Sequence, residues 1–426
     1  MSRALVVLFL INVLNFYDRQ VLGAILEPLR REFHLSDAQL GGLTTIFTVV
    51  YAVVGLPLGR LADTWSRKRL LAWGVAVWGG LTGLGAAAAS YAVLLATRLG
   101  VGIGEAVCAP VASSWIGDVV PVNGRAKAMA GFMLAVPIGG MLSFAVSGPV
   151  AQAYGWRTAM LLAAAPALLL VPVVLWLREP LRTAPAVTQQ TGRWFAPLAL
   201  LRNPAFIWIV ISGAIVNFSL YSFSTFLPAF LTRFHGLSVA QSGVSTGIGS
   251  GVAGLLGGVA AGIYGDRVIR GGLHRRMALA AGAALVSAPF AFAAILLPSG
   301  HAAQAVPLLM TAYGLLQMYY GLVYAAIQDI VGPDLRGTAM AVYFMAMYLC
   351  GASFGPLVTG RLSDHFAQIA ARAAGSPVIT EAAKASGLHQ AMYVIPVFSV
   401  ALAAALWAGA RSLASGSPAT PARHSA

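Results

Sequence analysis

Four ionisable residues lie inside stretches of the sequence that are otherwise almost wholly apolar. Asp18 and Arg19 are adjacent within INVLNFYDRQVLGAIL, and Arg98 and Glu105 belong to RLGVGIGEA. A charged residue at the centre of a lipid-exposed helix costs about 2.5 to 3.5 kcal/mol. Charges kept in such segments usually face a wet cavity or one another. These four therefore predict a buried network with the chemistry to bind an anion or carry a proton.

Composition determines the class of protein that must hold these charges. Of the 426 residues, 58% are hydrophobic and only 9% are charged, which excludes a water-soluble globule and predicts a polytopic membrane protein. The first apolar segment lacks the cleavage site of a secretory signal peptide. A spanning helix needs about 20 mostly apolar residues. We expect twelve such helices, at residues 4–26, 39–59, 70–89, 92–116, 126–150, 157–177, 206–230, 239–263, 277–297, 305–328, 338–360 and 389–411.

The basic excess of the chain predicts its topology. The net charge is +14, which in a soluble protein would suggest a nucleic-acid partner. Twelve spans place 18 of the 27 Lys and Arg residues on the side of the two termini and 7 on the other side. Because basic loops stay in the cytoplasm, we expect both termini there, in a bacterial inner (plasma) membrane, and no nucleic-acid partner.

Metal, cofactor and enzyme chemistry find no support in the sequence. Cys108 and Cys350 both fall inside expected spans, where small apolar fillers are the usual role of cysteine. All seven histidines fall in loops or at span ends, so no metal site is expected. The glycines of residues 247–258 lack the lysine and the preceding strand of a phosphate-binding loop. We therefore expect no cofactor and no enzyme activity.

The chain repeats itself at half length. DVVPVNGRAKAMA (residues 118–130) and DIVGPDLRGTAMA (residues 329–341) share an Asp, an Arg seven residues later and then Ala-Met-Ala. GRLAD and GIYGD likewise close the second span of each half. The repeat predicts two six-helix bundles in the same orientation. The expected division is residues 1–177 and 205–411 for the bundles, 178–204 for a cytoplasmic linker and 412–426 for a cytoplasmic tail.

Several motifs together resemble the major facilitator superfamily of secondary transporters, over essentially the whole chain. GRLADTWSRKR resembles the signature loop between its second and third helices, although Thr64 and Ser66 replace the usual Arg and Gly. RLGVGIGEA resembles its fourth-helix motif. The resemblance implies an all-α membrane fold of twelve helices in two six-helix bundles, which alternately opens a central site to either side.

A narrower likeness is to the spinster-like branch, which is known for proton-linked movement of lysophospholipids and sphingoid lipids. Its first helix carries Asn-x-x-Asp-Arg and its fourth carries Arg followed by Gly-x-Gly-Glu. GPLVTGRLSD (residues 355–364) also fits bacterial members of the branch. The matching residues here are Asn15, Asp18, Arg19, Arg98, Gly102, Gly104 and Glu105.

The resemblance implies roles for the buried charges, because the first and fourth helices line the central cavity in this architecture. Asp18 and Glu105 are the expected proton carriers, and Asn15, Arg19 and Arg98 the expected charge network and substrate contacts. Arg98 and Glu105 lie two helical turns, about 10 Å, apart on one face, and Asp18 is adjacent to Arg19. We expect the pKa of each acid to depend on how close that cation lies. We expect glycines 100, 102 and 104 to keep the fourth helix slim, so that the first helix can pack closely against it. The alternative is a static ion network that only joins two helices.

The family signature also implies a conformational gate. Asp63 is expected to meet the start of the eleventh helix, near Gly337, when the cytoplasmic side is shut. An anion at a helix N-terminus is favourable by about 0.3 to 1 kcal/mol when exposed. The residues assigned to the gate are Gly59, Asp63, Arg67, Lys68, Asp118, Arg125, Asp329 and Arg336.

The second half offers aromatic and amide side chains in place of charges. YGLLQMYYGLVYAAIQ places four polar residues on roughly one helical face, and NFSLYSFSTF adds two more. Such a wall suits an amphiphilic or aromatic cargo, although each tyrosine alone could equally be packing or anchoring at the interface. The residues are Tyr313, Gln317, Tyr320, Tyr324, Asn217 and Tyr221. A polar segment at residues 361–388 precedes the last span and is assigned no role.

We therefore predict a proton-coupled secondary transporter, working as a monomer, that moves an amphiphilic, lipid-like or organic-acid solute by alternating access. One alternative is a proton-independent facilitator of a small organic anion, with Arg98 binding its carboxylate. Another is a non-transporting lipid-binding protein or sensor on the same fold. Retained intramembrane carboxylates favour coupled transport.

Overall fold

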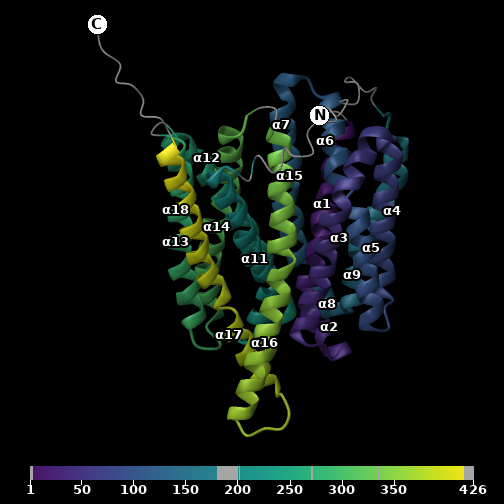
Figure 1. Ribbon diagram of the computed structural model, residues 1–426. Coiled ribbons are helices and arrows are strands. Elements are labelled where there is room, and N and C mark those ends of the chain that lie inside the picture. Colours follow the sequence, from purple (N-terminus) through teal and green to yellow (C-terminus); the bar gives the residue numbers. More distant parts are fainter. Residues whose placement is uncertain (1–2, 180–199, 201, 270–271, 333–334, 417–426) are drawn as a thin grey trace.

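The computed structural model describes residues 3–179, 200, 202–269, 272–332 and 335–416 (Figure 1). These residues are almost entirely helical and contain no strand. The first half consists of α1 (Arg3–Ala24), α2 (Leu26–Phe33), α3 (Asp37–Thr64), α4 (Arg67–Ala86), α5 (Tyr91–Glu105), α6 (Cys108–Val119), α7 (Val122–Met133), α8 (Ala135–Tyr154) and α9 (Trp156–Trp176).

The second half has the same order of long helices. It consists of α11 (Pro204–Arg233), α12 (Val239–Val268), α13 (His274–Leu296), α14 (Ala302–Ile330), α15 (Arg336–Ala346), a π-helical turn η3 (Met347–Ala352), α16 (Phe354–Ala373), α17 (Glu381–Ala391) and α18 (Val394–Gly416). Most of the expected linker and tail lies outside the described residues, so those boundaries stay a prediction.

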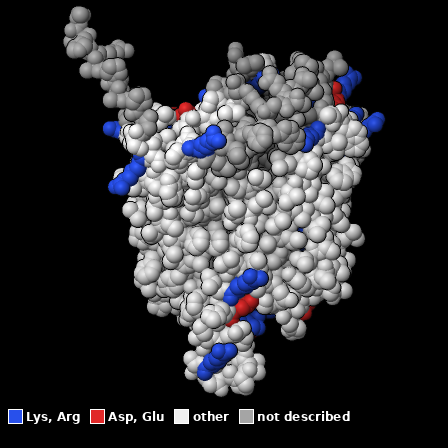
Figure 2. Space-filling model, in the orientation of Figure 1, with Lys and Arg blue, Asp and Glu red and all other residues white. Residues whose placement is uncertain are grey.

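Twelve helices cross the bundle, as the sequence predicts. Eleven described segments are long and apolar enough to span a membrane. The other is α4, which is less apolar but packs along α9 and α5 within the first half. Figure 2 shows that the charged side chains on this face lie mainly at the two ends of the molecule, with a broad uncharged band between them. The expected all-α membrane fold is therefore confirmed.

The two halves meet along three pairs of helices: α8 with α12, α3 with α16, and α1 with α11. We call the end where α1 begins and α18 ends the upper end, and the end that carries α2 and α17 the lower end, as in Figure 1. Matching helices also start in the same way. Ser36 and Gln39 form a capping box at the start of α3, and Ser238 and Gln241 form another at the start of α12. This repeated LSxAQ sequence adds to the half-length repeat.

Some expected helix boundaries are wrong. The first span ends at Ala24 and is followed by the separate helix α2. α16 continues to Ala373, past the expected end at residue 360, and α17 lies in what was expected to be a polar connection. The two form a hairpin at the lower end, where a Cβ on Gly387 would collide with the Ser363 carbonyl, so only glycine permits their close contact. Packing therefore extends helices that hydropathy alone ends earlier.

Candidate functional site

The four buried charges of the first and fourth spans meet at the centre of the first half, and each acid pairs with the cation of the other helix, not with the cation nearest to it in the sequence. Arg19 Nε lies 2.7 Å from Glu105 Oε2, and Arg98 Nη1 lies 3.7 Å from Asp18 Oδ2. The side chains of all four are at most 5% exposed. Successive residues of a helix point about 100° apart, so Asp18 and Arg19 face different neighbours. Each acid is therefore paired with a cation from the other helix.

Thr82 of α4 completes the Asp18 side of this network. Its hydroxyl lies 3.0 and 2.8 Å from the two carboxylate oxygens of Asp18, and Arg98 Nη2 donates to the same hydroxyl at 3.4 Å. Sequence reasoning missed Thr82, because a lone threonine in an apolar span carries no charge signal. The one sequence feature that could have indicated its role is that Thr82 lies among the glycines of GGLTGLG.

The glycines of the fourth span pack against α3 and α4, not against α1. A Cβ on Gly104 would lie 2.7 Å from the Gly74 carbonyl of α4, and one on Gly102 would lie 2.9 Å from the Phe47 carbonyl of α3. The expectation that they admit the first helix is therefore wrong. They bring α3 and α4 close enough for Thr82 and the aromatic residues of α3 to reach the charges.

Aromatic rings surround the Arg19 guanidinium. It lies 4.1 Å from the Tyr51 ring centroid, 4.7 Å from Phe16 and 5.6 Å from Phe47, which are cation–π distances. Among the described residues, Arg19 Nη1 and Glu105 Oε1 are buried without a hydrogen-bond partner. The ion pair thus leaves one buried donor and one buried acceptor without a protein partner, and each such unpaired group costs about 1 to 3 kcal/mol.

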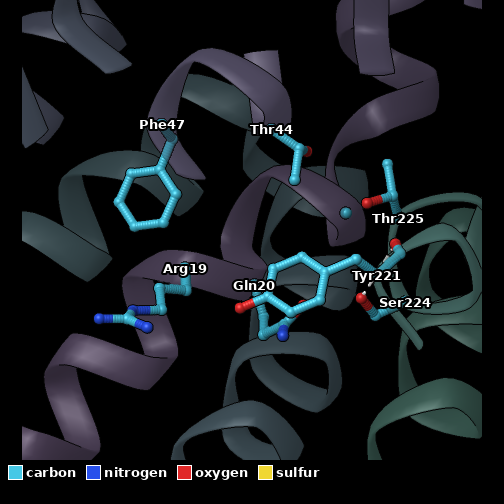
Figure 3. Close-up of a pocket in the computed structure, with 8 residues that line it drawn as sticks. Arg19, Gln20, Thr44, Phe47, Tyr221, Ser224 and Thr225 are labelled. Carbon is cyan, nitrogen blue, oxygen red and sulfur yellow. Dashed lines mark hydrogen bonds between the residues drawn. The ribbon is translucent and has the colours of Figure 1, made fainter. Parts of the chain in front are cut away.

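A pocket adjoins this guanidinium and is shared by both halves of the protein (Figure 3). In that view the Tyr221 ring lies between Gln20 and Ser224, with its hydroxyl directed to the side on which Arg19 lies. Arg98 does not line the pocket. The lining residues are Arg19, Gln20, Gly23, Thr44, Phe47, Tyr221, Ser224 and Thr225.

The other residues assigned to a cavity wall bond mainly to one another. The Tyr320 hydroxyl donates to Asn217 Oδ1 at 3.2 Å, and Gln317 Nε2 donates to the Tyr313 hydroxyl at 2.8 Å. Tyr324 packs its ring against Tyr343, Tyr320 and Phe344. Of the six, only Tyr221 lines the central pocket. Asn15 is buried on α1, and its Nδ2 has no partner in the described part of the chain.

An ion cluster that sequence reasoning missed joins the halves at the lower end. Arg233 of α11 lies 2.7 Å from Glu27 and 2.8 Å from Asp37, and Arg30 lies 2.6 Å from Glu27 and 2.5 Å from Glu381. Burial alone would raise the pKa of Glu27, but hydrogen bonds from Arg30 and the charges of Arg233 and Arg30 lower it to about 2. The carboxylate therefore stays ionised and holds both arginines.

Asp364 adds a second contact between the halves at this end. Its two oxygens accept the backbone N–H groups of Asp37 and Ala38, each at 2.9 Å, so a carboxylate of α16 caps the N-terminus of α3. The Ser363 hydroxyl donates to Asp37 at 2.6 Å. A Cβ on Gly360 would collide with the Asp37 carbonyl. Glycine at this position therefore lets the two helices touch.

Arg–Asp ion pairs occur at equivalent places in the two halves at the upper end. Arg67 pairs with Asp118, and Arg276 pairs with Asp329 at 2.5 Å. Arg125 and Arg336, which were assigned to the gate with those acids, donate their Nε to backbone carbonyls: Arg125 to Val120, and Arg336 to Gln328 at 3.0 Å and Val331 at 3.4 Å. The repeat thus preserves an Arg–Asp pair in each half, but with a different arginine from the one in the repeated motif.

Glu179 also belongs to the upper end and was missed. It accepts the Arg67 N–H at 2.7 Å and the Ser66 hydroxyl at 2.6 Å, and so caps α4. Burial would raise the pKa of Glu179, but the hydrogen bonds from Ser66 and from the Arg67 and Lys68 backbone lower it. Gly59 lies on α3 with Pro110 of α6 opposite it. The side chain of Asp63 lies outside the described part of the structure, so the predicted contact between Asp63 and the eleventh helix stays a prediction.

Similarity to known proteins covers nearly the whole chain. The family model of the Major Facilitator Superfamily matches residues 8–356. An "MFS-type efflux pump" of Mycolicibacterium smegmatis is 34% identical over 84% of this chain and 83% of the relative. "Protein spinster homolog 1" of Mus musculus is 30% identical over 84% of this chain and 72% of the relative.

Solved structures are also similar to this chain over nearly its whole length. A bacterial homolog of the human lysosomal transporter spinster, in an inward-facing and unoccupied conformation, superimposes with a TM-score of 0.87 at 28% identity, covering 98% of this chain and 99% of that one. Its inward-facing and occupied form gives 0.86 at the same identity and coverage. A D-xylose-proton symporter, at 19% identity and a TM-score of 0.73 over 95% of this chain and 96% of that one, shares the fold.

Proposed function

Since this chain belongs to the major facilitator superfamily, in its spinster-like branch, we propose that it is a proton-coupled transporter of an amphiphilic or organic-acid solute. The observation that carries the proposal is the pair Arg19–Glu105. Its side chains are at most 5% exposed, it leaves one guanidinium nitrogen and one carboxylate oxygen without a protein partner, and it adjoins a pocket built by both halves.

Glu105 has the surroundings that a proton carrier needs. Its side chain is fully buried and only one of its oxygens is bonded, to Arg19. Protonation of Glu105 would remove the charge that holds Arg19 and release the guanidinium. The two events are therefore linked through one ion pair. Asp18 is the second candidate, held by Thr82 and Arg98 rather than by the pocket.

The cargo is proposed to place its anionic or polar group at Arg19. The sequence-based alternative gave this role to Arg98, but Arg98 is 2% exposed, contacts Asp18 and Thr82 and does not line the pocket. Arg19 has the unused donor and lines the pocket. The rings of Phe47 and Tyr221 at the same place suit an apolar or aromatic cargo body.

We assign the upper end to the cytoplasm, because most Lys and Arg residues are predicted on that side. The ion cluster and the Asp364 cap then close the outer side. This closure, with the likeness to inward-facing relatives, supports an inward-facing state of an alternating-access cycle in the inner (plasma) membrane. Protons and membrane lipids are the proposed partners, and the protein is proposed to act as a monomer.

Transport by reconstituted protein tests the proposal. The purified protein is placed in liposomes with an imposed pH gradient and offered lysophospholipids and organic acids in parallel. Accumulation of one class that stops when the gradient is collapsed, and that Glu105→Gln abolishes, supports proton coupling. Downhill uptake that ignores the gradient would favour the uncoupled facilitator. Binding without uptake would favour the non-transporting protein.

A further inference from the structure

A π-helical turn interrupts the eleventh span where it passes the centre of the protein. In η3, Tyr348 accepts hydrogen bonds at its carbonyl from the Ser353 N–H at 3.0 Å and the Ser353 hydroxyl at 2.9 Å, a spacing of five residues. Such turns insert one extra residue into a helix and often mark functional sites. The segment contains no proline to explain the distortion, and the function proposed above does not use it.

The turn directs one side chain of the second half against the first half. The Tyr348 ring centroid lies 5.3 Å from that of Tyr51 on α3 and 6.3 Å from that of Tyr221 on α11. Further along α3, the Thr45 hydroxyl donates to the Ser353 carbonyl at 2.6 Å. The turn thus contacts α3 through both a ring and a backbone group, which fixes its position relative to the first half.

The ring that Tyr348 touches is the one that lies closest over Arg19. Tyr51 is 4.1 Å from the Arg19 guanidinium, and Arg19 is 2.7 Å from Glu105. A continuous row therefore runs from the second half, through Tyr348 and Tyr51, to the ion pair of the first half.

We propose that Tyr348 is a positioning residue for the Arg19–Glu105 pair, acting through Tyr51. While the halves are docked as in this structure, Tyr348 holds the Tyr51 ring over Arg19, and Arg19 is held against Glu105. When α16 moves away from α3, Tyr51 loses this support, and Arg19 becomes free to leave Glu105. The inference rests on the proposed proton coupling and adds the element by which the second half senses the proton site.

The charged and titratable neighbours of Glu105 come from three helices. They are Arg19 and Asp18 on α1, Arg98 on the same helix as Glu105, and the thiol of Cys108 on α6. Arg98 is committed to Asp18 and Thr82, so Arg19 is the cation whose position the second half can change. No charged side chain of the second half is needed for this link.

Double electron–electron resonance in nanodiscs tests the inference without knowledge of the cargo. Spin labels at the exposed positions Tyr154 and Ser299 report on the lower end, and labels at Trp176 and Ser415 report on the upper end, with both cysteines replaced by alanine. Distances are measured across a pH series for wild type, Tyr348→Leu and Tyr348→Phe. Phe344→Leu is the matched control, because its ring partners among the described residues, Tyr324 and Tyr343, both lie in the second half.

We expect wild type, Tyr348→Phe and Phe344→Leu to change their distance distributions with pH, whereas Tyr348→Leu loses most of that response while still sampling both states. Tyr51→Leu should behave like Tyr348→Leu, and the double variant should be no worse than either. A full pH response in folded Tyr348→Leu overturns the inference alone. A wild-type protein with no pH response overturns the proposed proton coupling and the inference with it.

Discussion

Arg19 and Glu105 are 86 residues apart in the chain and form a 2.7 Å ion pair in the centre of the first bundle. The pair explains why charges persist in apolar helices. Each charge is neutralised by a partner on another helix, so neither faces lipid alone. Breaking a buried pair by removing one partner typically costs about 3 to 5 kcal/mol. Substitutions that keep the hydrogen bond but remove the charge are therefore the informative ones.

Glu105→Gln is expected to abolish uphill uptake driven by a pH gradient while cargo exchange survives. The amide still accepts from Arg19 but cannot gain and lose a proton within the cycle. Asp18→Asn is expected to lose coupling in the same assay. A double variant that still concentrates its solute with pH as the only driving force would make the charges a structural network.

Thr82→Val is expected to lower stability by about 1 to 3 kcal/mol, because Asp18 then loses the hydroxyl that contacts both of its oxygens. Thermal unfolding in detergent measures the change. Thr48→Val is the matched control, since the buried Thr48 hydroxyl donates to carbonyls of its own helix. Equal melting of the two variants would contradict the role of Thr82.

Asp364→Asn is expected to favour opening of the lower end. The neutral amide loses the attraction of the carboxylate to the N-terminus of α3, which is up to about 2 kcal/mol in partly buried geometry, or about 5- to 30-fold in the ratio of states. Cysteine accessibility at the lower end measures the shift. Asp266→Asn, a side chain 84% exposed at the upper end, serves as the control. Unchanged accessibility in Asp364→Asn would argue against the cap.

The lower-end ion cluster is expected to lose its stabilising effect at low pH, when Glu27 becomes protonated. The pKa of Glu27 is about 2 in the folded protein, against 4.5 for a free glutamate. Its stabilisation is therefore present above about pH 4.5 and is lost as pH falls toward 2. A shift of this size corresponds to about 3 kcal/mol at neutral pH.

Glu27→Gln should therefore be less stable than wild type at pH 7, and the difference should shrink as pH falls toward 2. Unfolding curves recorded across this range measure both proteins. A constant difference over the whole range would show that the ionised carboxylate is not the source of the stability.

Local information in the chain determined the class and the fold. Hydropathy and the basic loops predict twelve spanning helices, and the repeated Asp…Arg…Ala-Met-Ala motif predicts two equivalent halves. The motifs around Asp18 and Glu105 identify the family, which the relatives confirm. These features can be recognised from the sequence because each depends on residues that are close together in one segment. A charged residue in an apolar segment can likewise be identified without knowing how that segment packs.

Only the tertiary structure decided which side chains meet. Helical periodicity defines the faces of a helix but not its rotation against its neighbours, so the sequence brought the four charges together without showing that Arg19 pairs with Glu105 and Arg98 with Asp18. Thr82, the Glu27 cluster and the Asp364 cap join residues from helices far apart in sequence, and η3 arises in a segment that contains no proline. Each of these features depends on how closely two helices approach each other. Glycines permit a close approach, and the packing of the other side chains determines where it occurs.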